Sequence, residues 1–206
     1  MSHKEQGEGL ASGSQNQRLD LSKNNSSFEP LSGLKLGVIS DTHISDKNQH
    51  LPRAVLDAFK HVDLIIHAGD IVCLAVIDEL KSACPEVMVV AGNMDQEEVK
   101  KKYPVKQVLE FAGYRVGLMH GSGPAVNLVS LLKDAFKEDD CDLIIFGHSH
   151  KAMNEAVDGV LFFNPGSATD LSAASNSFGL IELRRRLNNV GQESKGPGIE
   201  ARIIKI

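Results

Sequence analysis

The sequence predicts an α/β domain in which two facing mixed β-sheets are flanked by helices. In the first half of the chain, apolar strand segments alternate with helical segments, which is the pattern of parallel βαβ units. The second half carries a hairpin signal and several closely spaced strand segments, which favour antiparallel pairing. Two sheets packed face to face, with the helices outside, place both halves in one domain.

The first half of the chain is predicted from apolar runs and helical spacing. Apolar residues recur at helical spacing from Leu51 to Phe59, Pro52 suits a first helical turn, and Pro85 ends a second helix. The predicted elements are strands at 34–40, 63–67 and 86–91 and helices at 51–60 and 72–83. Right-handed crossovers bring the carboxyl ends of such strands to one edge, where ligands bind in open α/β sheets.

The second half combines a hairpin with further strands. Ala112-Gly113 separates two apolar segments and gives a two-residue hairpin signal. The predicted elements are strands at 106–111, 114–119, 142–146, 160–163, 178–183 and 201–206 and a helix at 127–137. The connection at 184–198 begins with three arginines and is predicted to be a mobile loop whose arginines form a solvated edge.

Length and composition indicate one globular domain. The chain has 206 residues, of which 42% are hydrophobic and 24% charged, which is ordinary for a globular protein. Residues 1–33 are rich in Ser, Gly, Asn and Gln and have few apolar side chains. We therefore predict a flexible N-terminal tail over 1–33 and a single folded domain over 34–206.

Charge and cysteine content limit the partners and the compartment. The net charge of -5 gives no general attraction to nucleic acid, so a dedicated nucleic-acid partner is not expected. Cys73, Cys84 and Cys141 are odd in number and widely spaced, which fits a reducing, cytoplasmic location. We expect no membrane span and no secretory signal, because no segment is long and apolar enough. Homo-oligomerisation stays open.

Five strand ends carry residues of the types that bind metal ions. In chain order they are Asp41-Thr42-His43, Gly69-Asp70, Gly92-Asn93, His120-Gly121 and Gly147-His148-Ser149-His150. Each alone has an ordinary structural explanation, because Gly-Asp and Gly-Asn are common turn pairs and a single histidine is more often a surface residue. Five in succession, all at predicted strand ends, indicate one shared site for two metal ions.

This ordered set resembles the calcineurin-like metallophosphoesterases, whose motifs run Asp-x-His, Gly-Asp, Gly-Asn, His-Gly and Gly-His-x-His. The resemblance covers residues 34–183, and the turn Asn164-Pro165-Gly166-Ser167 makes the chain most similar to the small YfcE-type phosphodiesterase branch. It implies an αββα sandwich. It also implies a metal-dependent phosphodiesterase that hydrolyses small-molecule phosphate esters with a metal-bridged hydroxide.

The resemblance further implies the roles of individual residues. One metal ion would be held by Asp41, His43, Asp70 and His150, and the other by Asp70, Asn93, His120 and His148. Asp70 would bridge the two ions, and Asp70, Asn93 and His120 would act in catalysis. The resemblance favours Mn²⁺, with Ni²⁺, Fe²⁺ or Zn²⁺ as alternatives, since mixed oxygen and imidazole ligands suit them all.

These residue types suit such a site. A carboxylate can bridge two cations and reduce their repulsion, while neutral imidazoles and an amide add ligand atoms without excess negative charge. Two metal ions about 3.5–4 Å apart can clamp a phosphoryl group and acidify a shared water.

One position departs from the larger members of this superfamily, many of which have histidine after Gly-Asn. This chain has Met94 there, and a methionine side chain cannot donate a proton to a leaving group. Asp95 is the next candidate donor. His67 is predicted to be a core or supporting residue, and Asn164 to stabilise its turn.

Two other functions remain open on the sequence. The same fold serves as a non-catalytic scaffold in the retromer's metallophosphoesterase-like subunit, although scaffold members tend to lose metal-binding histidines. A phosphomonoesterase or nuclease would use the same metal site and differ only in the walls of its pocket. The chain has no basic stripe interleaved with aromatic residues, which weighs against a dedicated nuclease.

Overall fold

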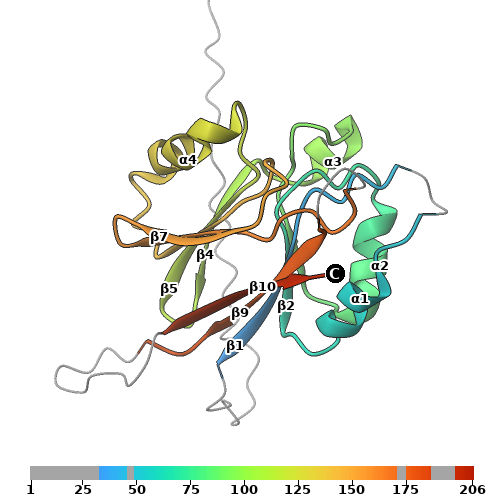
Figure 1. Ribbon diagram of the computed structural model, residues 1–206, viewed down its shortest axis with the longest axis horizontal. Coiled ribbons are helices and arrows are strands. Elements are labelled where there is room, and N and C mark those ends of the chain that lie inside the picture. The colour runs from blue at the N-terminus through green and yellow to red at the C-terminus, as the bar shows by residue number, and fades with distance from the viewer. Residues whose placement is uncertain (1–32, 46–48, 171–174, 187–197) are drawn as a thin grey trace, which may run out of the picture.

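Two five-stranded mixed sheets face each other in this computed structural model, which describes residues 33–45, 49–170, 175–186 and 198–206 (Figure 1). This confirms the predicted fold class. All of the predicted tail except Gly33 lies outside the described residues. No helix in the described part of the chain has the length and apolar character needed to cross a bilayer.

The first sheet is built around three parallel strands, with two antiparallel strands added at one side. Its order is β10 (Ile199–Lys205), β9 (Ser177–Leu183), β1 (Leu34–Ile39), β2 (Leu64–His67) and β3 (Val87–Val89). The β1–β2 and β2–β3 pairs are parallel, as the alternation of strand and helix predicts. Strands β9 and β10 pair antiparallel and attach to β1 through β9.

The second sheet has the same mixture of pairings. Its order is β4 (Lys106–Phe111), β5 (Tyr114–Met119), β6 (Leu143–Ile145), β8 (Val160–Asn164) and β7 (Met153–Val157). The predicted hairpin joins β4 and β5, while β5, β6 and β8 run parallel. The carboxyl ends of β5 and β6 therefore lie at one edge of this sheet.

Three apolar layers hold the sheets and helices together. Side chains alternate along each strand, so Leu64 and Ile66 of β2 enter the core between the sheets while Ile65 packs on the outside. Helices α1 (Arg53–Phe59) and α2 (Ala75–Ala83) cover the outer face of the first sheet (Figure 1). Helix α4 (Leu128–Phe136) covers the second sheet, next to the short 3₁₀ helix η2 (Ala125–Asn127).

The structure also differs from the predicted elements in places. The predicted helix 72–83 begins only at Ala75, because Val72 has a φ of 69° and forms a bridge with Ile44. Strand β7 and helix α3 (Glu97–Lys102) were not predicted. Both are short, and helix α3 buries only Val99, so neither has an apolar pattern long enough to detect.

The arginines after β9 lie at a solvated edge, as predicted. Arg184 pairs with Glu182 and Glu200, and Arg186 pairs with Asp142, in both cases on the exposed surface. Most of the loop predicted to be mobile, residues 187–197, lies outside the described residues.

We expect the core between α1 and the first sheet to depend on Phe59. This side chain is fully buried, lies edge-on to Phe178 at 5.5 Å, and fills the space left by Gly37, whose absent Cβ would lie 2.7 Å from the ring. The substitution F59A should lower the free energy of unfolding by about 3–5 kcal/mol in urea denaturation. The exposed-site control V105A should change it by less than about 0.5 kcal/mol. A comparable change in both variants would contradict this role of Phe59.

Candidate metal centre

The seven predicted ligands come together at the edge where the strands of both sheets end. Asp41 and His43 follow β1, Asp70 follows β2, Asn93 follows β3, His120 follows β5, and His148 and His150 follow β6. Main-chain hydrogen bonds join these segments. Asp41 N donates to Gly69 O at 3.0 Å, and Gly147 N donates to His120 O at 3.1 Å.

The main chain turns sharply at most of these ligands. Positive φ angles occur at Asp41 (52°), His43 (46°), Asp70 (55°), His148 (68°) and His150 (55°). Such angles are uncommon for residues other than glycine, and they concentrate at functional sites, where the surrounding structure holds them. The left-handed turns direct the side chains of several strands toward one point.

The first group of converging ligand atoms comes from Asp41, His43 and His150. The Nε2 atoms of His43 and His150 lie 3.1 Å apart. Asp41 Oδ1 lies 3.3 Å from His150 Nε2 and 3.9 Å from His43 Nε2. Two imidazole nitrogens and a carboxylate oxygen therefore face one small volume.

The second group consists of Asp41, Asp70 and His120, all buried. Asp70 Oδ2 lies 3.2 Å from His120 Nε2 and 3.6 Å from His43 Nε2. One oxygen of Asp70 thus stands between the two groups, in the place that the resemblance implies for a bridging ligand. Asp41 Oδ1 also lies 3.8 Å from His120 Nε2, so Asp41 reaches both groups instead of the first alone.

Asn93 and His148 lie beside the second group. Asn93 Oδ1 is 2.9 Å from His148 Nδ1, and the His148 ring lies edge-on to His120 with 5.4 Å between ring centroids. When His148 carries its proton on Nε2, it donates to Gly123 O at 2.8 Å, and the lone pair of Nδ1 then faces Asn93. Both side chains present ligand atoms next to His120.

The hydrogen bonds around the histidines suit metal binding. His120 donates from Nδ1 to Ala68 O at 2.7 Å, and His150 donates from Nδ1 to Asp170 Oδ2 at 2.7 Å. Each bond leaves the lone pair of Nε2 free for a metal ion, as is usual for metal-binding histidines. His120 Nε2 is buried and has no hydrogen-bond partner of acceptable geometry among the described residues. A bound cation would accept the lone pair of this nitrogen. The residues therefore fit a metal centre.

The electrostatics of the cluster also favour cations. Contact with Asp41, assisted by Asp170, raises the pKa of His150 to about 9. Burial opposes protonation of His120, but the Asp70 and Asp41 carboxylates outweigh it and raise its pKa. Burial likewise opposes ionisation of Asp70, but His120 and the Met94 N–H lower its pKa. In the metal-free protein, protons on His150 and His120 thus offset the negative charge of the nearby carboxylates. Bound metal ions would offset the same negative charge.

Two glycines allow the loops to approach the carboxylates. A Cβ on Gly92 would lie 2.1 Å from Asp70 Oδ1, and a Cβ on Gly147 would lie 2.7 Å from Asp41 Oδ2. Any side chain at either position would push a carboxylate out of place. These glycines belong to the Gly-Asn and Gly-His-x-His stretches, so the close packing explains why glycine stands there.

Two residues outside the ligand set have the supporting roles predicted for them. Asn164 donates to Gly147 O at 2.7 Å and accepts from Gly166 N at 2.8 Å, so it stabilises its turn and the histidine loop. His67 is fully buried beside Thr42 at 3.1 Å, and burial lowers its pKa to about 3. His67 therefore stays neutral in the core.

Asp170 supports the site but was not predicted to do so. Its carboxylate accepts a hydrogen bond from His150 Nδ1. Asp170 follows the Asn164-Pro165-Gly166-Ser167 turn, where Ser167 Oγ accepts the Asp170 N–H at 3.0 Å and donates to Asp41 O at 2.7 Å. Its place near that turn was the only signal in the sequence.

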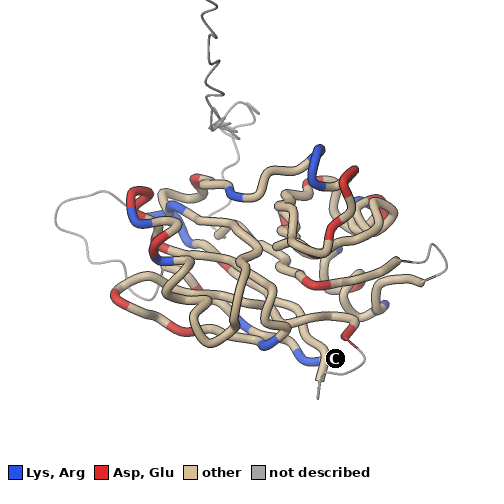
Figure 2. The backbone as a smooth tube through the Cα atoms, turned by 90° about the horizontal axis from the view of Figure 1, so that it is seen from above, with Lys and Arg blue, Asp and Glu red and all other residues tan. Residues whose placement is uncertain are grey.

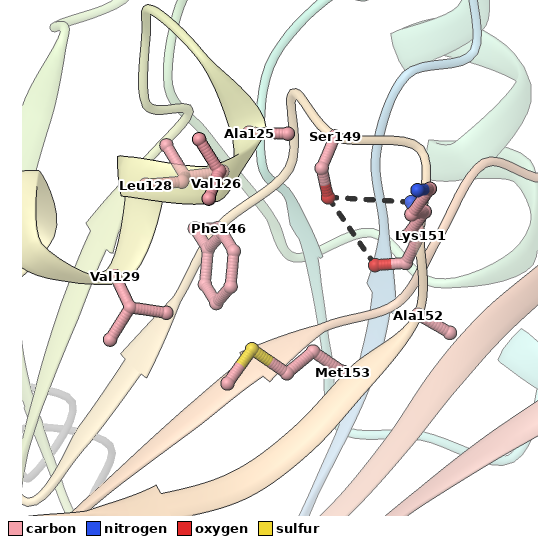
Figure 3. Close-up of a pocket in the computed structure, with 9 residues that line it drawn as sticks. All are labelled: Ala125, Val126, Leu128, Val129, Phe146, Ser149, Lys151, Ala152 and Met153. Carbon is pink, nitrogen blue, oxygen red and sulfur yellow. Dashed lines mark hydrogen bonds between the residues drawn. The ribbon is translucent and has the colours of Figure 1, made fainter.

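A mostly apolar cavity of about 380 Å³ adjoins the histidine loop (Figure 3). Its lining combines η2 and the start of α4 with the chain from Phe146 to Met153. The lining residues are Ala125, Val126, Leu128, Val129, Phe146, Ser149, Lys151, Ala152 and Met153. Ser149 stands between the ligands His148 and His150, so the cavity and the metal centre share one loop.

A family model, the calcineurin-like phosphoesterase superfamily domain, matches residues 34–186 of the chain. The chain belongs to the calcineurin-like phosphoesterase superfamily. The matched range includes all seven predicted ligands.

Relatives within this superfamily cover most of the domain. A probable metallophosphoesterase of Methanothermobacter thermautotrophicus is 38% identical over 134 residues, which are 65% of this chain and 77% of that protein. A phosphodiesterase of Methanocaldococcus jannaschii is 29% identical over 168 residues, covering 74% of this chain and 95% of the relative. The crystal structure of Vps29 complexed with Zn²⁺ from Entamoeba histolytica shares the fold, with a TM-score of 0.65 and 23% identity, over 84% of this chain and 99% of Vps29.

We expect the substitution D170N to weaken metal binding, because the amide at position 170 holds His150 less well than a carboxylate. Loss of such a supporting carboxylate commonly costs about 10–100-fold in metal affinity. Isothermal titration with Mn²⁺ measures the change, with the exposed-site variant H50Q as control. Equal affinities for D170N and the wild type would contradict a supporting role for Asp170.

The same variant should change the pH dependence of the metal-free protein. The folded-state pKa of His150 is raised from 6.5 to about 9, so its pairing contributes stability below about pH 6.5 that is lost as pH rises to about 9. In D170N this loss should be smaller and occur at lower pH. Urea midpoints of both proteins between pH 6 and 9.5, measured with a chelator present, test the difference.

Proposed function

We propose that this protein is a metal-dependent phosphodiesterase that hydrolyses small phosphate esters. The observation that carries the proposal is the position of Asp70 Oδ2, 3.6 Å from His43 Nε2 and 3.2 Å from His120 Nε2, between two groups of ligand atoms. Membership of the superfamily and the similarity to the M. jannaschii phosphodiesterase support it. We propose Mn²⁺ as the preferred ion, on the family resemblance alone.

The predicted ligands would be distributed between the two metal ions. Asp41, His43 and His150 would hold one ion, Asn93, His120 and His148 the other, and Asp70 would contact both. When bound, two such ions supply Lewis-acid stabilisation of the phosphoryl group and activate a water molecule. The left-handed turns and buried carboxylates hold the ligands in place before substrate arrives, so little reorganisation is needed during reaction.

The leaving group receives no proton from the residues after Gly92. Met94 is 59% exposed beside the site, and only its main-chain N–H takes part, donating to Asp70 Oδ1 at 2.8 Å. Asp95, the alternative donor named from the sequence, is buried, and both its oxygens accept main-chain N–H groups. This arrangement disfavours Asp95 as the proton donor.

The rival functions have less support. The Vps29 fold is shared with this chain, but the ligand atoms of all seven predicted residues come together here, which favours an enzyme over a scaffold. Figure 2 shows Lys and Arg interspersed with Asp and Glu along the described backbone rather than gathered in one stripe. Together with the net charge of -5, this disfavours a dedicated nuclease. The three free cysteines support our proposal of a cytoplasmic location.

Metal removal and D70N together test the function. Chelation should abolish hydrolysis of phosphodiesters, and adding back Mn²⁺, Ni²⁺, Fe²⁺ or Zn²⁺ singly should restore it to different extents. D70N should lose more than about 100-fold in activity and bind both ions poorly, because a neutral amide bridges two cations badly. The exposed-site variant H61Q serves as the control. The proposed activity would be refuted if the wild-type protein showed no metal-dependent hydrolysis of any ester in a panel of phosphate mono- and diesters.

Rates should depend steeply on the pKa of the leaving group. With Met94 in place of a proton donor, the departing oxygen must leave as an anion, and general acid catalysis of about 10²–10⁴-fold is missing. Nitrophenyl diesters should therefore react well and alkyl diesters slowly. M94H should flatten this dependence if its imidazole reaches the leaving oxygen. Rates on substituted phenyl phosphodiesters provide the test, and a flat plot for the wild type would show that another group supplies the proton.

A further inference from the structure

Asp95 is a buried carboxylate that binds the main chain of two ligand-bearing loops. It is 4% exposed. Its Oδ2 accepts the N–H of Gly92 at 2.7 Å and of Asp70 at 3.2 Å, and its Oδ1 accepts the N–H of Val72 at 2.7 Å. The loop after β2 and the loop after β3 are therefore joined through one side chain.

The loop that Asp95 binds is conformationally strained. Asp70 and Val72 have φ angles of 55° and 69°, and a β-branched residue such as valine is strongly disfavoured in that region. Strained residues of this kind persist only where surrounding contacts hold them. Hydrogen bonds to an ionised carboxylate are stronger than neutral ones, so Asp95 offsets the strain at both positions.

The two aspartates hold each other's loops in a reciprocal arrangement. Asp95 accepts the N–H of Asp70, while Asp70 Oδ1 accepts the N–H of Met94, the residue before Asp95. With Oδ1 fixed in this way, Oδ2 of Asp70 is directed toward His43 and His120. The orientation of the predicted bridging oxygen thus depends on a loop that Asp95 fastens.

We propose that Asp95 is a positioning residue for the metal centre, which orients Asp70 through its own N–H and Asn93 through the N–H of the preceding Gly92. The inference rests on the two-metal site of the proposed function. The carboxylate oxygens of Asp95 face the main chain instead of the ligand cluster, so the effect of Asp95 on metal binding would be indirect. Loss of the carboxylate should release the turn at Asp70 and move the shared oxygen away from one or both groups.

The test compares D95N with D63N by isothermal titration with Mn²⁺. Asp63 also accepts a main-chain N–H, from Lys35 at 2.8 Å, but it lies at the start of β2, at the opposite end of the strand from Asp70. Affinities are corrected for the fraction folded, measured by near-UV circular dichroism. D95N should bind Mn²⁺ about 10-fold or more weakly, or hold fewer ions, while D63N should match the wild type.

A second variant covers the case in which D95N does not fold. Glycine adopts positive φ without strain, so V72G should remove part of the need for Asp95. The double variant D95N/V72G should fold better than D95N and regain part of its Mn²⁺ affinity. Folded D95N/V72G should still bind Mn²⁺ more weakly than V72G alone, because the N–H groups of Asp70 and Gly92 have lost their carboxylate acceptor. Equal affinities for these two variants would refute the positioning role.

The remaining outcomes separate this inference from the proposed function. Wild-type affinity and stoichiometry in folded D95N would overturn the positioning role and leave the phosphodiesterase proposal intact. Equal losses in D95N and D63N would also overturn it, because the effect would then be one of general stability. Wild-type protein that binds no Mn²⁺ and hydrolyses no phosphodiester would overturn both.

Discussion

The buried carboxylate of Asp41 joins the two halves of the site. It stands at the end of β1 in the first sheet, is fully buried, and accepts the N–H of His148 from the second sheet at 3.1 Å. The Ser40 hydroxyl donates to the same carboxylate at 2.7 Å. Burying a charge without partners costs several kcal/mol, so these donors and the neighbouring imidazoles are required for the fold as well as for the site. The contact between the sheets at this edge is thus polar, whereas elsewhere it is apolar.

Rigidity at this edge comes from the main chain more than from side-chain packing. Most of the predicted ligands occupy left-handed turns that are strained in isolation, and glycines let neighbouring loops approach within contact distance of the carboxylates. Several of these turns are held by hydrogen bonds from other segments, such as Ser167 Oγ to Asp41 O and His43 N to Asp70 O. A site organised in this way loses little entropy on binding a cation, because its ligands are already ordered.

The sequence was sufficient to predict every described strand except β7, the parallel pairing in the first half of the chain and the convergence of the seven candidate ligands. Each of these features depends on apolar periodicity or on residue types at strand ends, both of which are visible without a structure. Helix α3 and strand β7 were missed because their exposed, polar sequences carry no such period. The roles of Asp95 and Asp170 were missed for a different reason. Each acts through hydrogen bonds whose partners are set by turn geometry, and turn geometry follows from the complete fold.

The distribution of ligands along the chain has a consequence for biosynthesis. Asp41 and His148 contact each other although they are 107 residues apart, and His43 and His150 are separated by the same distance. During synthesis on the ribosome, strands β1, β2 and β3 emerge before the loop that carries His148 and His150. Asp41, His43 and Asp70 are therefore exposed on the nascent chain before these two histidines are available. A complete pocket for either ion exists only after the Gly-His-x-His segment has been translated and the second sheet has docked. If the site binds metal ions as proposed, they would reach full coordination only after the two sheets have assembled.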